Sequence, residues 1–283
     1  MNKIISLLGI CLFVVKLSAQ QSNVPNRDEI MSFLKTKTLV VLEDNPLSEY
    51  NLVLKHVMKE EWTMTPFDFI AIKDFDKKRL DPAYSFLILT QVKYDKDKTN
   101  TTYNFMSLLM GGSAYSLTSM PDMCSIPMSY YGVGDEVYSY KLGIFLRFMQ
   151  NHVKMLMGDP GLASENILNH YNKNMKELKG KTLYLVASEM AKDVNTEAKI
   201  KKVYPGPFKL VSKDDIQKSI ENKEDIVFLH KVGPEKTKQK ARVFKILVGA
   251  SDAQFYYFDY HVINDNDPDG FLSRDFKKLA KKL

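Results

Sequence analysis

The stretch Leu34-Lys35-Thr36-Lys37-Thr38-Leu39 recurs as Leu178-Lys179-Gly180-Lys181-Thr182-Leu183, at an offset of 144 residues. Both copies lead directly into an apolar run, Val40–Leu42 and Tyr184–Val186. Three further matches follow in the same order, at offsets between 141 and 138: Pro66–Ile70 with Pro207–Val211, Phe86–Val92 with Val227–Val232, and Leu108–Gly111 with Ile246–Gly249. Matches that stay in step over this length predict a duplicated unit.

Each unit shows the same pattern of predicted elements: strand, helix, strand, helix, strand, strand, helix. Its first strand is apolar without alternation, as buried central strands are. Asp44-Asn45-Pro46 supplies a cap residue and a proline where the first long helix begins, and Val137–Met157 and Phe271–Leu283 are the closing helices. Two parallel steps followed by a hairpin predict an α/β fold: two tandem repeats of a mixed β-sheet, in the order βαβαββα, with helices packed on it.

The first 20 residues have the features of a secretory signal peptide: Lys3, the apolar run Ile4–Val15, and small residues before the expected cleavage near Ala19 or Gln20. The apolar run is too short to span a bilayer. We therefore expect an exported protein, periplasmic or secreted. The remaining chain divides into a first α/β repeat over 24–157, a linker with a leading helix over 158–179, and a second repeat over 180–283.

Composition limits the classes of partner. The chain of 283 residues is 45% hydrophobic and has a net charge of +6, which is typical of a globular protein. The positive charge is spread along the chain, and this argues against a nucleic-acid partner. No segment after the signal peptide is apolar enough to predict a transmembrane segment in the mature chain. Cys124 is the one cysteine outside the signal peptide, so no internal disulfide is predicted.

The element order of each unit resembles the thioredoxin fold and the N-terminal domain of TolB and related envelope proteins. Redox-active thioredoxins carry Cys-x-x-Cys after the first strand. This chain has Asp44-Asn45-Pro46-Leu47 and Ser188-Glu189-Met190-Ala191 there, which argues against thiol redox catalysis. The repeated Leu-Lys-x-Lys-Thr-Leu opening resembles uncharacterised exported proteins of Gram-negative bacteria, and that resemblance implies no activity.

The sequence contains no recognised catalytic motif. Gly111-Gly112-Ser113 comes closest to a nucleophile turn, but Gly249-Ala250-Ser251 matches it in the second unit, which favours a strand-ending turn. The histidines lack the spacing of a zinc site. The sequence thus predicts no catalytic residue and no cofactor apart from calcium, considered next.

The segment Asp265-Asn266-Asp267-Pro268-Asp269-Gly270 fits the first half of a calcium loop, with Asp265, Asp267 and Asp269 as oxygen ligands before a glycine. The residue at loop position 12, where a bidentate Glu belongs, is Phe276. Two interpretations stay open: a calcium site, or a solvated turn that begins the last helix.

The segment 116–133 has no counterpart of equal length in the second unit and is predicted to be a loop. Its residues Met120, Met123, Met128, Tyr130 and Tyr131 are adaptable apolar and aromatic side chains. They form either a partner-binding surface or a lid over the edge of the sheet.

Together these features favour a non-catalytic exported envelope protein that binds another protein or a surface polymer such as a glycan. One alternative is a hydrolase with a cleft between the two repeats; the other is a calcium-dependent surface or adhesion module. A deep cleft with facing carboxylates, lined by both units, would favour the hydrolase.

Overall fold

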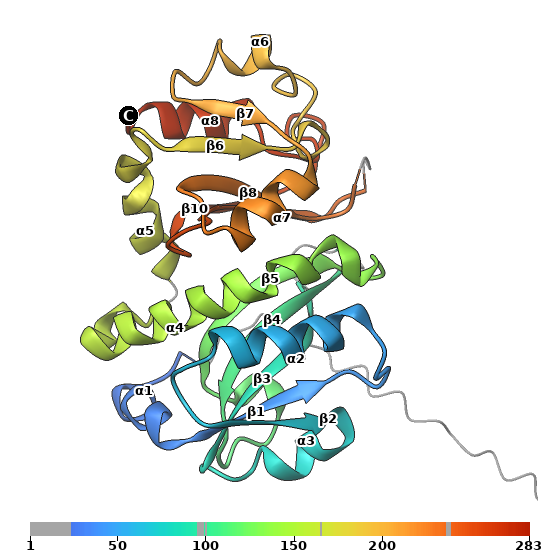
Figure 1. Cartoon of the computed structure of the whole chain (residues 1–283), viewed down its shortest axis with the longest axis vertical. Coiled ribbons are helices and arrows are strands. Elements are labelled where there is room, and N and C mark those ends of the chain that lie inside the picture. The colour runs from blue at the N-terminus through green and yellow to red at the C-terminus, as the bar shows by residue number, and fades with distance from the viewer. Residues whose placement is uncertain (1–23, 95–98, 100, 165, 236–238) are drawn as a thin grey trace, which may run out of the picture.

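The computed structural model describes residues 24–94, 99, 101–164, 166–235 and 239–283, so the predicted signal peptide lies outside the described residues. Two five-stranded mixed sheets with helices packed on them make up the molecule (Figure 1). This arrangement confirms the predicted α/β class and the two tandem sheet repeats.

The elements follow the chain as two similar series. The first repeat comprises α1 (Arg27–Ser32), β1 (Lys37–Leu42), α2 (Glu49–Glu61), β2 (Phe67–Ala71), α3 (Ile72–Lys78), β3 (Tyr84–Lys93), β4 (Thr102–Met110), β5 (Asp122–Tyr130) and α4 (Leu142–Gly158). The linker contains α5 (Ile167–Tyr171) and a 3-10 helix, Asn172–Leu178. The second repeat comprises β6 (Thr182–Leu185), α6 (Glu197–Ile200), β7 (Phe208–Leu210), α7 (Lys213–Glu221), β8 (Ile226–Val232), β9 (Arg242–Gly249), β10 (Phe255–Val262) and α8 (Ser273–Ala280).

The two sheets share one topology. Their strand orders are β2-β1-β3-β4-β5 and β7-β6-β8-β9-β10. The first three strands of each sheet pair in parallel, and each of the last two pairs antiparallel with the strand before it. Each sheet therefore has one strand more than the predicted order βαβαββα. The additional strands are the edge strands β5 and β10.

The prediction of a loop over 116–133 was wrong for Asp122–Tyr130, which is β5. Two irregularities in its pairing with β4, at Asn104/Phe105 and Leu108/Leu109, break the simple alternation of side chains. A bulged strand does not show the period of two by which strands are found in a sequence.

Strand pairing also corrects the match between the repeats by one residue. Thr38 pairs with Phe67, and Leu183 pairs with Phe208. Since Phe67 matches Phe208 in the sequence comparison, Thr38 corresponds to Leu183 and Val40 to Leu185. The match of Phe86 with Val227 shifts by one residue in the same way, because Thr38 pairs with Ser85 and Leu183 with Val227. A slip of one residue moves every side chain to the opposite face. In the corrected register, the closing helices α4 and α8 cover corresponding faces of the two sheets.

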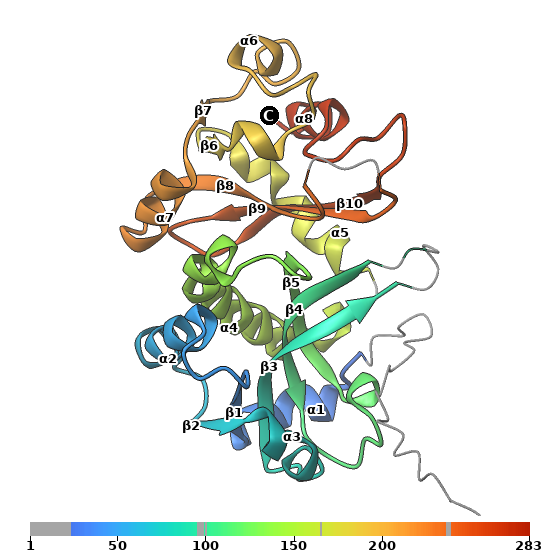
Figure 2. The same cartoon turned by 90° about the vertical axis from the view of Figure 1, so that its right-hand side faces the viewer.

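Helix α4 lies between the two sheets (Figures 1 and 2). A single hydrophobic core joins it to Leu108 of β4 and to Phe228 of β8. The rings of Phe148 and Phe255 stack with their centroids 3.5 Å apart, and the guanidinium of Arg147 donates to the carbonyl oxygens of Ala250 and Ser251, each at 3.0 Å. A helix that is apolar on most sides must be covered on most sides, so α4 joins the two repeats into one core.

The linker protects the edge of the second sheet. The Asn172 side chain accepts from Phe258 N at 2.8 Å and donates to its carbonyl oxygen at 3.0 Å, while Asn174 donates to the Phe255 carbonyl oxygen at 2.9 Å. These contacts satisfy backbone groups of β10 that would otherwise be open to another strand.

Within the part of the chain that the structure describes, no helix is both long and apolar enough to cross a membrane.

A fully buried ion pair fastens α8 to the second sheet. Lys245 Nζ lies 2.8 Å from both carboxylate oxygens of Asp275, and both side chains have an exposed fraction of 0%. Asp275 also accepts from the Tyr257 hydroxyl at 2.7 Å and from Leu272 N at 2.8 Å. Since each charge is buried and hydrogen-bonded, removing one partner leaves the other without compensation.

We predict that Lys245→Met and Asp275→Asn each lower the free energy of unfolding by about 3–5 kcal/mol. The double variant should lose less than the sum of the two, because it leaves no buried charge unpaired. As a matched control, Glu197→Gln removes the exposed pair with Lys201 and should cost less than about 1 kcal/mol. Urea unfolding measures all four; additive effects in the double variant would contradict the assignment.

Candidate functional site

A cavity of about 310 Å³ lies at the junction of the two repeats. Its walls come from β3, β4, β5 and α4 of the first repeat, from the linker with α5, and from β10 of the second repeat. Most of the lining side chains are apolar or aromatic. Clefts of this size at interfaces between domains are the usual places for small-molecule sites.

The cavity forms because the linker packs differently against the two edge strands, β5 and β10. Asparagine side chains close the edge of β10, whereas Ile167 and Leu168 of α5 face the cavity beside β5 and remain half-buried. The linker therefore leaves a gap along β5 instead of packing onto it.

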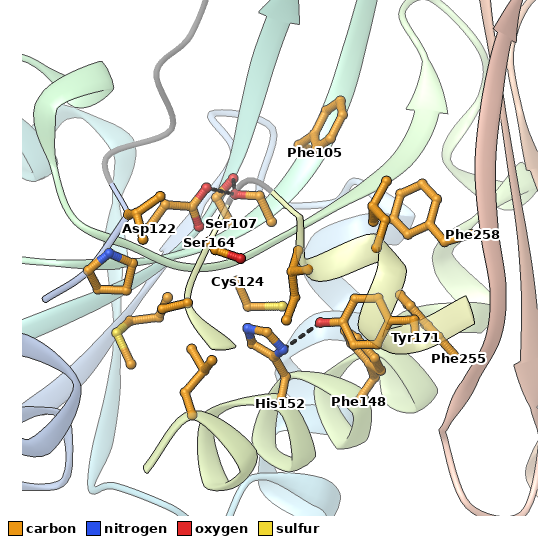
Figure 3. Close-up of a pocket in the computed structure, with 18 of the residues that line it drawn as sticks. Phe105, Ser107, Asp122, Cys124, Phe148, His152, Ser164, Tyr171, Phe255 and Phe258 are labelled. Atoms are coloured by element: carbon orange, nitrogen blue, oxygen red, sulfur yellow. Dashed lines mark hydrogen bonds between the residues drawn. The ribbon is translucent and has the colours of Figure 1, made fainter. Parts of the chain in front are cut away.

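One end of the cavity is polar (Figure 3). Asp122 Oδ2 accepts from the Ser125 hydroxyl at 2.7 Å. Ser125 Oγ lies 2.8 Å from Ser107 Oγ, which in turn lies 3.0 Å from the Thr90 hydroxyl. Three strands thus contribute a row of hydroxyl groups that ends at one carboxylate.

Asp122 is the electrostatically unusual member of this row. Burial raises the pKa of its carboxyl group to about 6, and hydrogen bonds from Ser125 and from the backbone of Cys124 only partly oppose the rise. Its second oxygen, Oδ1, is buried and has no hydrogen-bond partner among the described residues. A buried carboxylate that is only partly hydrogen-bonded costs stability and marks a candidate binding group.

Beside this polar end, Cys124, His152 and Tyr171 come together from β5, α4 and α5 (Figure 3). The Tyr171 hydroxyl lies 2.5 Å from His152 Nδ1, and the ring makes a further hydrogen bond with the backbone of Met123. Burial lowers the pKa of His152 to about 4. The imidazole is therefore neutral at pH 7, and its hydrogen-bonding positions are already occupied.

Burial, together with the charge of Asp122, raises the pKa of the Cys124 thiol well above its usual value. A nucleophilic cysteine needs a lowered pKa. The group of Cys124, His152 and Tyr171 resembles a catalytic arrangement in composition, but its electrostatics keep the thiol protonated.

We predict that Cys124 reacts with iodoacetamide at pH 7.5 at least 100-fold more slowly than a surface thiol, because only the thiolate attacks. The surface thiol for comparison is introduced into the same protein by the substitution Ser188→Cys, at an exposed position, and both sites are followed by peptide mass spectrometry. Equal rates at the two sites would contradict a buried, protonated thiol, and a faster rate at Cys124 would show an activated nucleophile.

The residues predicted to bind a partner lie mostly inside the protein. Met120, Met123 and Met128 each have an exposed fraction of 1%, so the expected accessible surface of methionines is wrong. Met123 and Met128 lie on β5 and Met120 lies just before it, and all three pack into hydrophobic clusters of the first repeat. Tyr130 is half-buried, and Tyr131 is exposed. Met123 also lines the cavity.

The structure does not gather the three carboxylates of the predicted calcium loop. Asp267 pairs with Arg274 at 2.5 Å and Asp269 with Lys231 at 2.5 Å, while Asp265 is exposed. The described residues contain no group of three or more His, Cys, Asp or Glu side chains placed to hold a metal ion. Cationic side chains thus occupy two of the expected ligands, which supports the interpretation as a turn.

A second buried polar cluster lies between the repeats. Lys141 Nζ is 3.2 Å from His230 Nδ1, and His230 Nε2 is 2.8 Å from the Pro127 carbonyl oxygen. Burial lowers the pKa of both Lys141 and His230. The space beside them measures about 30 Å³, against about 310 Å³ for the cavity described above, so this cluster holds the repeats together and offers little room for an organic ligand.

Sequence reasoning missed Asp122, His152 and Tyr171 as site residues. They lie on three separate elements, and no motif connects them. Comparison with models of protein families, with curated proteins and with solved structures finds no match for this chain, so the function has to be argued from the chemistry of the cavity.

Proposed function

We propose that this protein is a non-catalytic exported binding protein, and that it binds a small organic molecule in the cavity between its repeats. The observation that carries the proposal is the cavity itself: about 310 Å³, largely apolar, and lined from both repeats and the linker. Apolar walls provide binding energy, and a few polar groups orient the ligand.

The chemistry of the lining supports binding more than catalysis. The Cys124 thiol is held protonated, and His152 is neutral with its ring already hydrogen-bonded. Asp122 is the one carboxylate among the described residues that line the cavity. A hydrolase of the expected kind needs two facing carboxylates. The cavity is lined by both repeats, but its described lining residues do not supply the second carboxylate.

Export and a partner in the cell envelope remain predictions from the sequence. A cavity of this size has room for only one apolar group of a protein or a surface polymer. A free small molecule fills the space directly, and we therefore favour it as the ligand.

Toluene, a neutral apolar probe, tests the proposal. We expect saturable binding with a dissociation constant near or below about 1 mM, which is within the usual energy per atom for small ligands. Ala163→Phe places a ring in the cavity wall and should weaken binding at least tenfold, whereas Ala187→Phe, at an exposed position, should leave it unchanged.

Isothermal titration calorimetry measures the affinity, and the thermal unfolding temperature checks that both variants fold. Absence of saturable toluene binding in the wild-type protein would refute the proposal. So would a folded Ala163→Phe variant that binds toluene as well as the Ala187→Phe control.

A further inference from the structure

The distribution of charge inside the cavity identifies the kind of ligand it accepts. Asp122 is the one carboxylate among its described lining residues, and none of those residues is Lys or Arg. His152 is neutral at pH 7 because burial lowers its pKa. The cavity therefore carries a single negative charge, although the whole chain has a net charge of +6.

The negative charge and the aromatic rings occupy different ends of the cavity. Asp122 and Ser107 lie at one end, while Tyr171, Phe255 and Phe258 lie at the other (Figure 3). The cavity is thus complementary to an elongated ligand with a charged head and an apolar body.

We propose that the cavity binds an organic ammonium ion: a small molecule with an apolar, ring-sized body and one cationic amino group that rests against Asp122. This inference rests on the proposed function, since it names the class of ligand for the same cavity. The amino group donates to the Asp122 carboxylate, and the apolar body packs against the rings of Tyr171, Phe255 and Phe258.

Two features favour a cation over a neutral or anionic head group. Oδ1 of Asp122 is a buried acceptor without a donor among the described residues, and an ammonium group supplies donors and charge together. An anion would be placed beside a buried carboxylate with no cationic side chain in the lining, which is unfavourable in a medium of low dielectric constant.

The position of Asp122 also fits a functional role. A buried carboxylate whose pKa is raised to about 6 is deprotonated at neutral pH at the expense of folding stability. Replacing it by a neutral isostere should therefore stabilise the empty protein, as expected of a residue that serves binding.

The experiment compares two probes of nearly the same shape, 2-phenylethylammonium and 2-phenylethanol, by isothermal titration calorimetry at pH 7.5. The wild-type protein should bind the ammonium compound at least tenfold more tightly. In Asp122→Asn this preference should disappear, while the affinity for 2-phenylethanol stays within about threefold of wild type, since the apolar walls are unchanged. Asp44→Asn, at an exposed position outside the cavity, is the control and should keep the preference.

Thermal unfolding shows whether the Asp122→Asn variant folds. Since the raised pKa of Asp122 means that its ionisation destabilises the folded state, the variant should have a higher Tm than wild type at pH 7.5. This difference should shrink as the pH falls through 6 towards 4, where the wild-type carboxyl group is protonated.

The possible results separate the two proposals. Equal binding of both probes, or a preference for the ammonium compound that survives in a folded Asp122→Asn variant, would overturn the ammonium proposal and leave the binding cavity intact. Failure of both probes and of toluene to bind would overturn both proposals. Tighter binding of N-acetyl-lysine methylamide than of 2-phenylethylammonium would identify a lysine side chain of a partner protein as the source of the ammonium group and would overturn the small-molecule assignment.

Discussion

The burial of helix α4 between two sheets is the constraint on which the rest of the molecule depends. Ten of its residues are buried, and their apolar surface is covered by the first sheet on one side and the second on the other. Full burial of one large apolar side chain contributes about 1.5–3 kcal/mol. Exposing this helix would lose several such contributions, so the two repeats share one core. The two repeats stack in the same sense along the molecule (Figure 1).

The cavity follows from that packing. The chain leaves α4 at Gly158 and must reach β6 at Thr182, and on this path the linker passes the edge strands of both sheets. Its asparagine side chains are hydrogen-bonded to β10, so the corresponding edge of β5 is left beside open space. Asp122, at the first position of β5, is thereby placed at the polar end of the cavity with a carboxylate that the protein itself only partly satisfies.

The fold was largely predictable from the sequence, because duplication and uninterrupted apolar runs survive as local patterns. The parallel strands, the hairpins and the closing helices were predicted. The edge strand β5 was missed because two bulges disturb its alternation. The match of Leu39 with Leu183 was off by one, because similarity between two apolar runs does not fix which face of the sheet each residue occupies. The site could not be predicted: Asp122, His152 and Tyr171 meet only after α4 and α5 have packed, and the burial that shifts their pKa values exists only in the folded chain.

The most direct test of the account is the titration of Asp122 itself, followed by the NMR signal of its side-chain carboxyl carbon with and without 2-phenylethylammonium. In the free protein the carboxyl group should titrate with a pKa of about 6. With the ammonium compound bound the pKa should fall, because a neighbouring cation stabilises the carboxylate. A carboxyl group that titrates near the unperturbed value of about 3.9, or whose pKa does not change when the compound binds, would contradict the central claim.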